Sequence, residues 1–424
     1  MTSLPLNLLP DTAAVADDGG LTIGGLAVAA LAAAYGTPLF VYDEQHLRSR
    51  CREAVDVFGH QSAVYATKAF LCGAMARLAY EEGMALDVAS GGEMFVALRS
   101  GVPADALTVH GNNKSVDELR MALRAGVRYI VVDCDEELDR LEALHGDGFA
   151  VPDVVLRITP GVHAHTHEYI ATGQDDSKFG FNLTNGAAMA AVDRARRMSS
   201  VNLVGLHSHI GSNVFAADSF ARAAEVMAKF AVPLDLPELV LGGGLGVAYV
   251  GGEEAPTITE WGRVLLDACA ALGVTSRISV EPGRSIVAAA AITVYTVGVV
   301  KQIDGVRTYV AVDGGMSDNP RPVLYGSGYE AFAPERVAAE RPMRARLVGK
   351  HCESGDVLIF DAALPADLVA GDLLANPVTG AYGHSMASNY NKLTRPPVVF
   401  VRDGEARLVV RRETYEDLVA CEID

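Results

Sequence analysis

Short apolar runs alternate with amphipathic stretches along the first two thirds of the chain. Strand-like runs lie at 63–66, 85–89, 107–110, 129–132, 154–158, 203–209, 239–241 and 278–280. Helix-type spacing of apolar residues fills most of the gaps, as at 73–82, 92–100, 115–125 and 220–230. Eight strand–helix units over about 240 residues predict a (β/α)₈ barrel of the TIM type. A doubly wound open sheet shows the same alternation, and the number of units does not separate the two folds.

The pattern changes after Arg284. Apolar runs at 291–300, 308–312, 358–360 and 398–401 are separated by turns rich in Gly, Asp and Pro, and little helical spacing remains. This pattern of short apolar runs and turns is typical of a mainly antiparallel β domain. We therefore predict an α/β chain with a barrel at 37–285 and a β domain formed by 286–424 together with the N-terminal arm 1–36.

Charge and cysteine usage narrow the classes of function. The 424 residues carry a net charge of −18, which disfavours nucleic acid and anionic membrane as partners. The six cysteines are scattered and form no CxxC pair, so neither a zinc site nor a disulfide framework is expected. The apolar run 21–35 is too short to cross a bilayer, and the residues before it contain no Lys or Arg, so it does not read as a secretory signal. The sequence predicts a cytoplasmic protein.

Lys68 is the first candidate for chemistry, in the stretch Tyr65-Ala-Thr-Lys68 after the first barrel strand. A lysine at a buried strand end is costly to desolvate, and a Schiff base with an aldehyde would remove its charge. A plain surface lysine is the simpler interpretation of this stretch alone, but residues at other strand ends favour an aldehyde cofactor.

Functional groups of a barrel gather at the carboxyl ends of its strands. Glu281 ends the last predicted strand, where a buried carboxylate could keep a pyridine nitrogen protonated, or could simply pair with an arginine. The glycines at 242–246 and the Gly283-Arg284 pair could hold a phosphate, although their spacing does not fit G-x-G-x-x-G.

Together these stretches resemble the diaminopimelate decarboxylases, pyridoxal-phosphate enzymes with a fold like that of alanine racemase. The resemblance runs in order from about residue 37 to 395, through Tyr65-Ala-Thr-Lys68, Asp87-Val-Ala-Ser-Gly-Gly-Glu93, His207-Ser-His209-Ile-Gly-Ser212, Gly242-Gly-Gly-Leu-Gly246, Glu281-Pro-Gly-Arg284, Asp313-Gly-Gly-Met316, Arg321-Pro-Val-Leu-Tyr325-Gly, Cys352-Glu353-Ser-Gly-Asp356 and Gly380-Ala-Tyr382.

The resemblance implies a role for each matching residue. Lys68 would bond to the cofactor, His209 would stack on its ring, and Glu281 would pair with its pyridine nitrogen. The other residues expected to hold the cofactor are Asp87, Ser212, Gly244, Gly283, Arg284 and Tyr382. The residues expected to bind the far end of the substrate are Arg284, Arg321, Tyr325, Glu353 and Tyr382. Cys352 would return a proton after carbon dioxide leaves. Cys352, Glu353 and Tyr382 would come from the second subunit, so the resemblance implies a homodimer with shared active sites.

The activity implied is decarboxylation of meso-2,6-diaminopimelate to L-lysine, because Arg321 and Glu353 suit an amino-acid group at the substrate's far end. Asn213 and Gly383-His384 depart from the family pattern. The alternatives are a decarboxylase of another diamino acid or of a glutamyl substrate, an amino-acid racemase, and a non-catalytic regulator that binds pyridoxal phosphate. The alternating His163, His165 and His167 suggest a metal, but nothing else supports one, and we predict no metal site.

Overall fold

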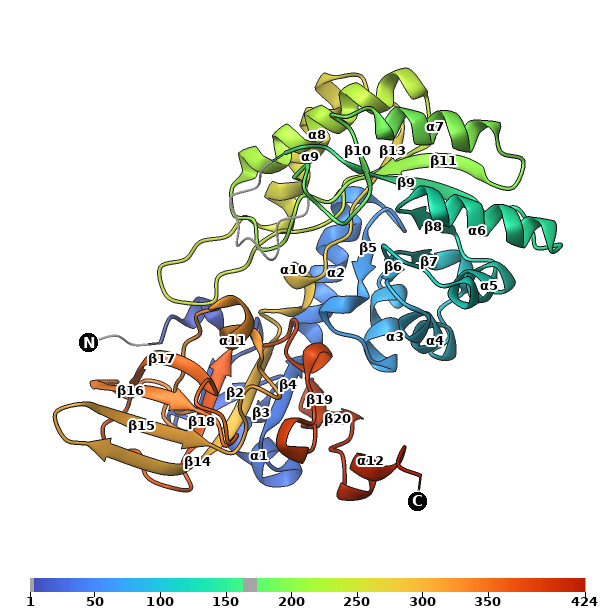
Figure 1. Ribbon diagram of the computed structural model, residues 1–424. Coiled ribbons are helices and arrows are strands. Elements are labelled where there is room, and N and C mark those ends of the chain that lie inside the picture. The colour runs from blue at the N-terminus through green and yellow to red at the C-terminus, as the bar shows by residue number, and fades with distance from the viewer. Residues whose placement is uncertain (1–3, 163–173, 424) are drawn as a thin grey trace. The chain divides into compact units, whose positions relative to one another are not determined.

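The computed structural model describes residues 4–162 and 174–423, and the chain forms two compact units (Figure 1). The barrel unit comprises 50–246 and 255–285, and the sheet unit comprises 1–49, 247–254 and 286–424. Among the described residues, no helix combines the length and the apolar character that crossing a membrane requires.

The barrel unit is built on a closed parallel sheet. Its strands are β5 (Val64–Ala66), β6 (Ala85–Val88), β7 (Leu107–Val109), β8 (Tyr129–Val132), β9 (Asp153–Thr159), β11 (Asn202–His207), β12 (Glu238–Val240) and β13 (Arg277–Ser279), and the short β10 (Phe181–Asn182) pairs with β9. They pair in that order, and a parallel bridge from Ala63 to Val280 closes the ring. Closure excludes the doubly wound alternative and confirms the predicted barrel.

Helices follow most of these strands. They are α2 (Glu44–Phe58, which begins in the sheet unit), α3 (Gly73–Glu81), α4 (Gly91–Arg99), α5 (Val116–Ala125), α6 (Asp135–Gly146), α7 (Ala187–Arg197), α8 (Ala217–Ala231), α9 (Ile258–Ala271) and the short α10 (Arg284–Val287). Local sequence sets their starts: Ser115 and Thr257 each form a capping box with the glutamate three residues later, at the starts of α5 and α9. Figure 1 shows α4 to α7 following their strands in chain order. Every strand therefore ends at a loop on the same rim of the barrel.

The sheet unit is a mixed β structure. Its main sheet runs β17 (Val357–Leu364), β16 (Met343–Val348), β15 (Arg307–Val312), β14 (Ala291–Ile303), β4 (Leu39–Asp43), β19 (Val398–Arg402) and β20 (Glu405–Val410), with β18 (Leu373–Pro377) also paired to β14. Two pairs, β15–β16 and β4–β19, are parallel, and the other pairs are antiparallel. The remaining elements are β1 (Ala14–Val15), β2 (Leu21–Ile23), β3 (Leu26–Ala27), α1 (Val28–Tyr35), α11 (Arg321–Tyr325) and α12 (Tyr415–Val419).

The N-terminal arm contributes to the core of the sheet unit. Leu21, Ile23 and Leu31 pack in one buried apolar cluster with Val41 and Ile292. Strand β4 lies in this sheet between β14 and β19, although the sequence analysis grouped residue 37 onward with the barrel. All five residues of β4 are buried, so its run of apolar residues carries no sign of which sheet it joins.

Candidate functional site

Lys68 follows strand β5 in a single 3₁₀ turn, Thr67–Ala69. The turn is fixed by Thr67, whose hydroxyl donates to the carbonyl of Asp87 (2.7 Å) and contacts a carboxylate oxygen of Glu93 (3.0 Å). The lysine side chain is exposed between two buried neighbours, rather than desolvated at the strand end as the sequence suggested. It is exposed because the turn carries it past the last paired residue, and this leaves the amine accessible.

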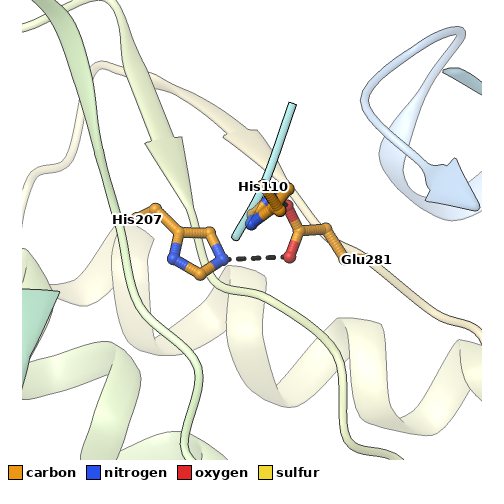
Figure 2. Close-up of side chains that lie close together, drawn as sticks. All are labelled: His110, His207 and Glu281. Atoms are coloured by element: carbon orange, nitrogen blue, oxygen red, sulfur yellow. Dashed lines mark hydrogen bonds and ion pairs between the residues drawn. The ribbon is translucent and has the colours of Figure 1, made fainter. Parts of the chain in front are cut away.

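Glu281 lies buried just beyond β13, and two histidines hold it. Its Oε1 lies 2.7 Å from Nε2 of His110, and its Oε2 lies 2.9 Å from Nε2 of His207. Figure 2 shows the three side chains pointing toward one another. The partners of this carboxylate are therefore histidines at the ends of β7 and β11, and not the arginine that the sequence analysis considered as an alternative. His110, His207 and Glu281 also have the spacing of metal ligands, but both contacts of the carboxylate have the lengths of hydrogen bonds.

The charges of the cluster favour an ionised Glu281. Burial alone would raise the pKa of its carboxyl group, but the charges and hydrogen bonds of His110 and His207 hold that pKa well below its usual range. Burial lowers the pKa of His207 to about 4, whereas the carboxylates of Asp87 and Glu281 overcome burial and raise the pKa of His110. Burial also raises the pKa of Asp87 to about 6, against the opposing effect of His110.

The glycine loop after β12 forms a close-packed backbone cradle. A Cβ on Gly243 would lie 2.1 Å from the carbonyl oxygen of Glu281. Gly244 has φ +108°, and a Cβ there would lie 2.1 Å from the carbonyl oxygen of Gly211. The backbone N–H of Gly243 donates to Nδ1 of His209 over 3.3 Å, which fixes the ring beside the loop. Only glycine fits these two positions.

Two more predicted residues lie beside this cradle. Arg284 donates from Nη2 to the hydroxyl of Ser212 over 2.9 Å. At Gly283, a Cβ would come within 3.0 Å of the carbonyl oxygen of Ala66, so the last strand end approaches that of β5 closely. An accessible lysine, a buried ionised carboxylate and a glycine cradle fit the aldehyde, the pyridine nitrogen and the phosphate of pyridoxal phosphate.

In the sheet unit, the predicted Arg321 lies on α11 and is buried. Its Nη1 donates to the hydroxyl of Tyr329 over 2.6 Å, and its guanidinium lies 4.2 Å from the ring centre of Tyr249. Burial alone would lower the pKa of Arg321, but the nearby tyrosines raise it above its ordinary value. Tyr325 ends the same short helix and is half-buried. The arginine is thus a fixed cation and not a surface charge.

Cys352 and Glu353 are both exposed, on a loop that Asp356 organises. The buried carboxylate of Asp356 accepts from the backbone N–H groups of Met316 (2.7 Å) and His351 (2.9 Å). The backbone N–H of Cys352 donates to the side chain of Asn391 over 2.9 Å. The stretches 313–316 and 352–356, which the sequence presents as separate motifs, therefore form one structure.

Residues that depart from the family pattern show special backbone or burial. Asn213 has left-handed backbone, at φ +59°, and so does Tyr382, the matching residue just before the departing pair Gly383-His384, at φ +60°. His384 packs edge-on against Phe40, and burial lowers its pKa to about 4. His163, His165 and His167, and most of the stretch that begins at Glu168, lie outside the described residues.

Sequence reasoning left His110 without a role and gave none to His207. Each had a usable signal. His110 follows the third barrel strand, and strand ends of a barrel converge. His207 lies two residues before His209, and alternate residues of a strand face the same side. Arg157 on β9 is a buried cation whose charge acts on both histidines, and no pattern in the sequence predicted it. Its guanidinium lies 4.2 Å from the ring centre of Phe179.

Comparisons with known proteins agree with this geometry. Residues 44–288 match the family described as pyridoxal-dependent decarboxylase, pyridoxal binding domain. The diaminopimelate decarboxylase of Mycobacterium tuberculosis is 47% identical over 98% of both chains, and that of Bacillus subtilis is 48% identical over 96% of this chain and 95% of its own. The crystal structure of diaminopimelate decarboxylase from M. jannaschii with L-lysine has a TM-score of 0.91 at 32% identity and covers 98% of both chains.

Proposed function

This chain belongs to the diaminopimelate decarboxylases, carboxy-lyases of lysine biosynthesis that use pyridoxal phosphate, and we propose that the residues gathered at the rim of its barrel carry out the reaction. The substrate is meso-2,6-diaminopimelate, and the products are L-lysine and carbon dioxide. The observation that best supports the residue roles is the buried, ionised Glu281 on the barrel rim that also carries Lys68 and the glycine cradle.

Residues of the barrel unit bind and orient the cofactor. Lys68 would supply the amine for the aldehyde of the cofactor, and Glu281 would keep its pyridine nitrogen protonated. The phosphate would be held by Ser212 and by backbone N–H groups at Gly244, where a side chain would not fit, and at Gly283, where a Cβ would make a tight contact of 3.0 Å. When bound, pyridoxal phosphate supplies a ring that takes up the electron pair left as carbon dioxide departs.

The remaining cofactor contacts have distinct tasks. His209 would stack on one face of the cofactor ring, and its low pKa would keep it neutral there, because burial and the charge of Lys68 both oppose protonation. Asp87 lies close enough to Lys68 for the lysine's charge to lower the carboxyl pKa, and it provides the counter-charge on this side of the rim. Tyr382 contacts cofactor or substrate.

Residues of the sheet unit recognise the far end of the substrate and return the proton. Arg321 and Tyr325, together with Arg284, bind the distal carboxylate, and Glu353 receives the distal amine. The buried cation–π and hydrogen-bond contacts of Arg321 support this role, because they hold its guanidinium in one orientation. Cys352 protonates the carbon that has lost its carboxyl group, and its exposed thiol is accessible to do so.

We further propose a homodimer in which Cys352, Glu353 and Tyr382 complete the partner's active site. Mixing Lys68→Ala with Cys352→Ala protein after mild dissociation tests it. If the two residues act across subunits, random pairing restores about a quarter of the wild-type sites, since half the dimers are mixed and each has one intact site. If both residues of a site come from one subunit, mixing restores no activity.

We also propose a domain division and a cellular location. Of the predicted division into a barrel at 37–285 and a β domain at 286–424 with the arm, the boundary at 285/286 is supported by the change of sequence pattern at Arg284, whereas residues 37–49 belong to the sheet unit. A cytoplasmic location is supported by the scattered placement of the six cysteines in the sequence, which contains no CxxC pair.

Borohydride reduction of the holoenzyme followed by peptide mapping tests the cofactor assignment. The reduced cofactor should be found on the peptide that contains Lys68, and Lys68→Ala should lose both the label and carbon dioxide release. His60→Gln, at an exposed position, is the matched control. A label on another lysine would refute the assignment, and racemisation without carbon dioxide release would refute the activity.

A further inference from the structure

We infer that His110 and His207 are positioning residues with unequal tasks: His110 is the cationic donor that keeps Glu281 ionised, and His207 is a neutral donor that fixes the orientation of the carboxylate. The inference rests on the proposed pairing of Glu281 with the pyridine nitrogen. It assigns two residues that the resemblance left without a role.

The geometry divides the carboxylate evenly between the two rings. Each oxygen of Glu281 receives one hydrogen bond, of 2.7 Å from His110 and 2.9 Å from His207. The two rings meet edge to face at 4.9 Å between centres, so each restricts the other's rotation (Figure 2). A carboxylate has about four lone-pair positions, and two therefore remain for a third donor. The direction in which they point is set by the two histidines.

The surroundings of the two rings are not equivalent. His110 Nε2 also lies 3.9 Å from Oδ1 of Asp87, so a positive ring faces two carboxylates. Nδ1 of His207 is buried and has no hydrogen-bond partner within the described part of the chain. A second proton on His207 would place an unpaired donor in the interior, which is costly. His207 is therefore the neutral tautomer with its proton on Nε2.

The other charged groups near the cluster do not change this assignment of a charged His110 and a neutral His207. The groups within electrostatic reach are Lys68, Asp87, Tyr129, Arg157 and His209. Arg157 disfavours a positive charge on both histidines and thus does not separate them. Asp87 is the group that favours the cation at His110, because its Oδ1 lies 3.9 Å from Nε2 of that ring.

Replacing each histidine by glutamine tests the asymmetry, because glutamine keeps a neutral N–H donor and cannot carry a charge. The measurement is the dissociation constant of pyridoxal phosphate from the full-length protein across pH. His110→Gln should weaken binding about tenfold, as expected when a charged hydrogen bond is replaced by a neutral one. It should also move the acidic limb of the profile to higher pH, because Glu281 without its cation protonates sooner. His207→Gln should change the constant less than about threefold and keep the wild-type profile.

Equal effects of the two variants, or a larger effect at His207, would overturn the inference. Unfolding of either variant would not leave it untested, since the wild-type holoenzyme can be examined directly by nitrogen NMR of labelled histidines. At pH 6 that spectrum should show His110 with both nitrogens protonated and His207 with a proton on Nε2 alone; the reverse would refute it. Glu281→Gln separates the two proposals: unchanged cofactor binding in that variant would refute the role of Glu281 itself.

Discussion

Asp356 holds the loop that carries Cys352 and Glu353, and replacing it with alanine should loosen that loop. One carboxylate oxygen accepts from Met316 N–H at 2.7 Å, and the other accepts from His351 N–H at 2.9 Å. The Asp356 carboxylate packs closely against the backbone of Gly349, where a Cβ would lie 2.2 Å from Oδ2 of Asp356. Two short charged hydrogen bonds in a buried place are lost together in Asp356→Ala.

The size of the effect follows from those two bonds. Each hydrogen bond to a charged group contributes about 1.5–3 kcal/mol, so the variant should lose roughly 3–6 kcal/mol of unfolding free energy. That is a large part of the roughly 5–15 kcal/mol typical of a folded domain. Asp361→Ala is the matched control, because Asp361 is exposed and lies 3.7 Å from an exposed Arg344. The control should cost about 0.5 kcal/mol or less.

Urea unfolding and steady-state kinetics together measure the prediction. In Asp356→Ala, the unfolding midpoint should fall well below that of Asp361→Ala, and kcat should fall because Cys352 and Glu353 lose their fixed loop. The pyridoxal phosphate content should stay at the wild-type level, because the proposed cofactor contacts on the barrel rim are unchanged. Equal midpoints for the two variants would show that the Asp356 hydrogen bonds do not stabilise the loop.

Two other predictions concern single groups. Cys352→Ala should lower kcat about a hundredfold, measured as lysine formation, while the bound cofactor is retained. Burial raises the pKa of Asp318 to about 7, so its native carboxyl group binds a proton that the unfolded chain has released above about pH 4. The contribution of Asp318 to the stability of the folded protein is therefore fully present below about pH 4 and is lost as the pH rises through about 7. Asp318→Asn should flatten this part of the profile of urea midpoint against pH. Loss of cofactor from the Cys352 variant, or an unchanged profile in the Asp318 variant, would contradict these assignments.

The barrel could be predicted from the chain because each of its strands carries a local signal. Apolar runs such as 107–110 alternate with capped helices, and the observed strands lie within a residue or two of the expected ranges. Strand β4 could not be placed in the same way. A strand buried on both faces is apolar in either sheet, and its partners β14 and β19 are far away in the sequence.

The sequence alone determined the cofactor class and the residue types of the site. The chemistry requires a Schiff-base lysine, a strand-end carboxylate and phosphate-binding glycines, and each of these occurs in a short stretch of sequence. It also placed Glu281 at a strand end. Only the tertiary structure decided that Glu281 lies between His110 and His207, and that Asp356 joins two separate motifs. These pairings bring together residues far apart in the chain, and a contact of that kind depends on how strands close and loops pack, which no local pattern records.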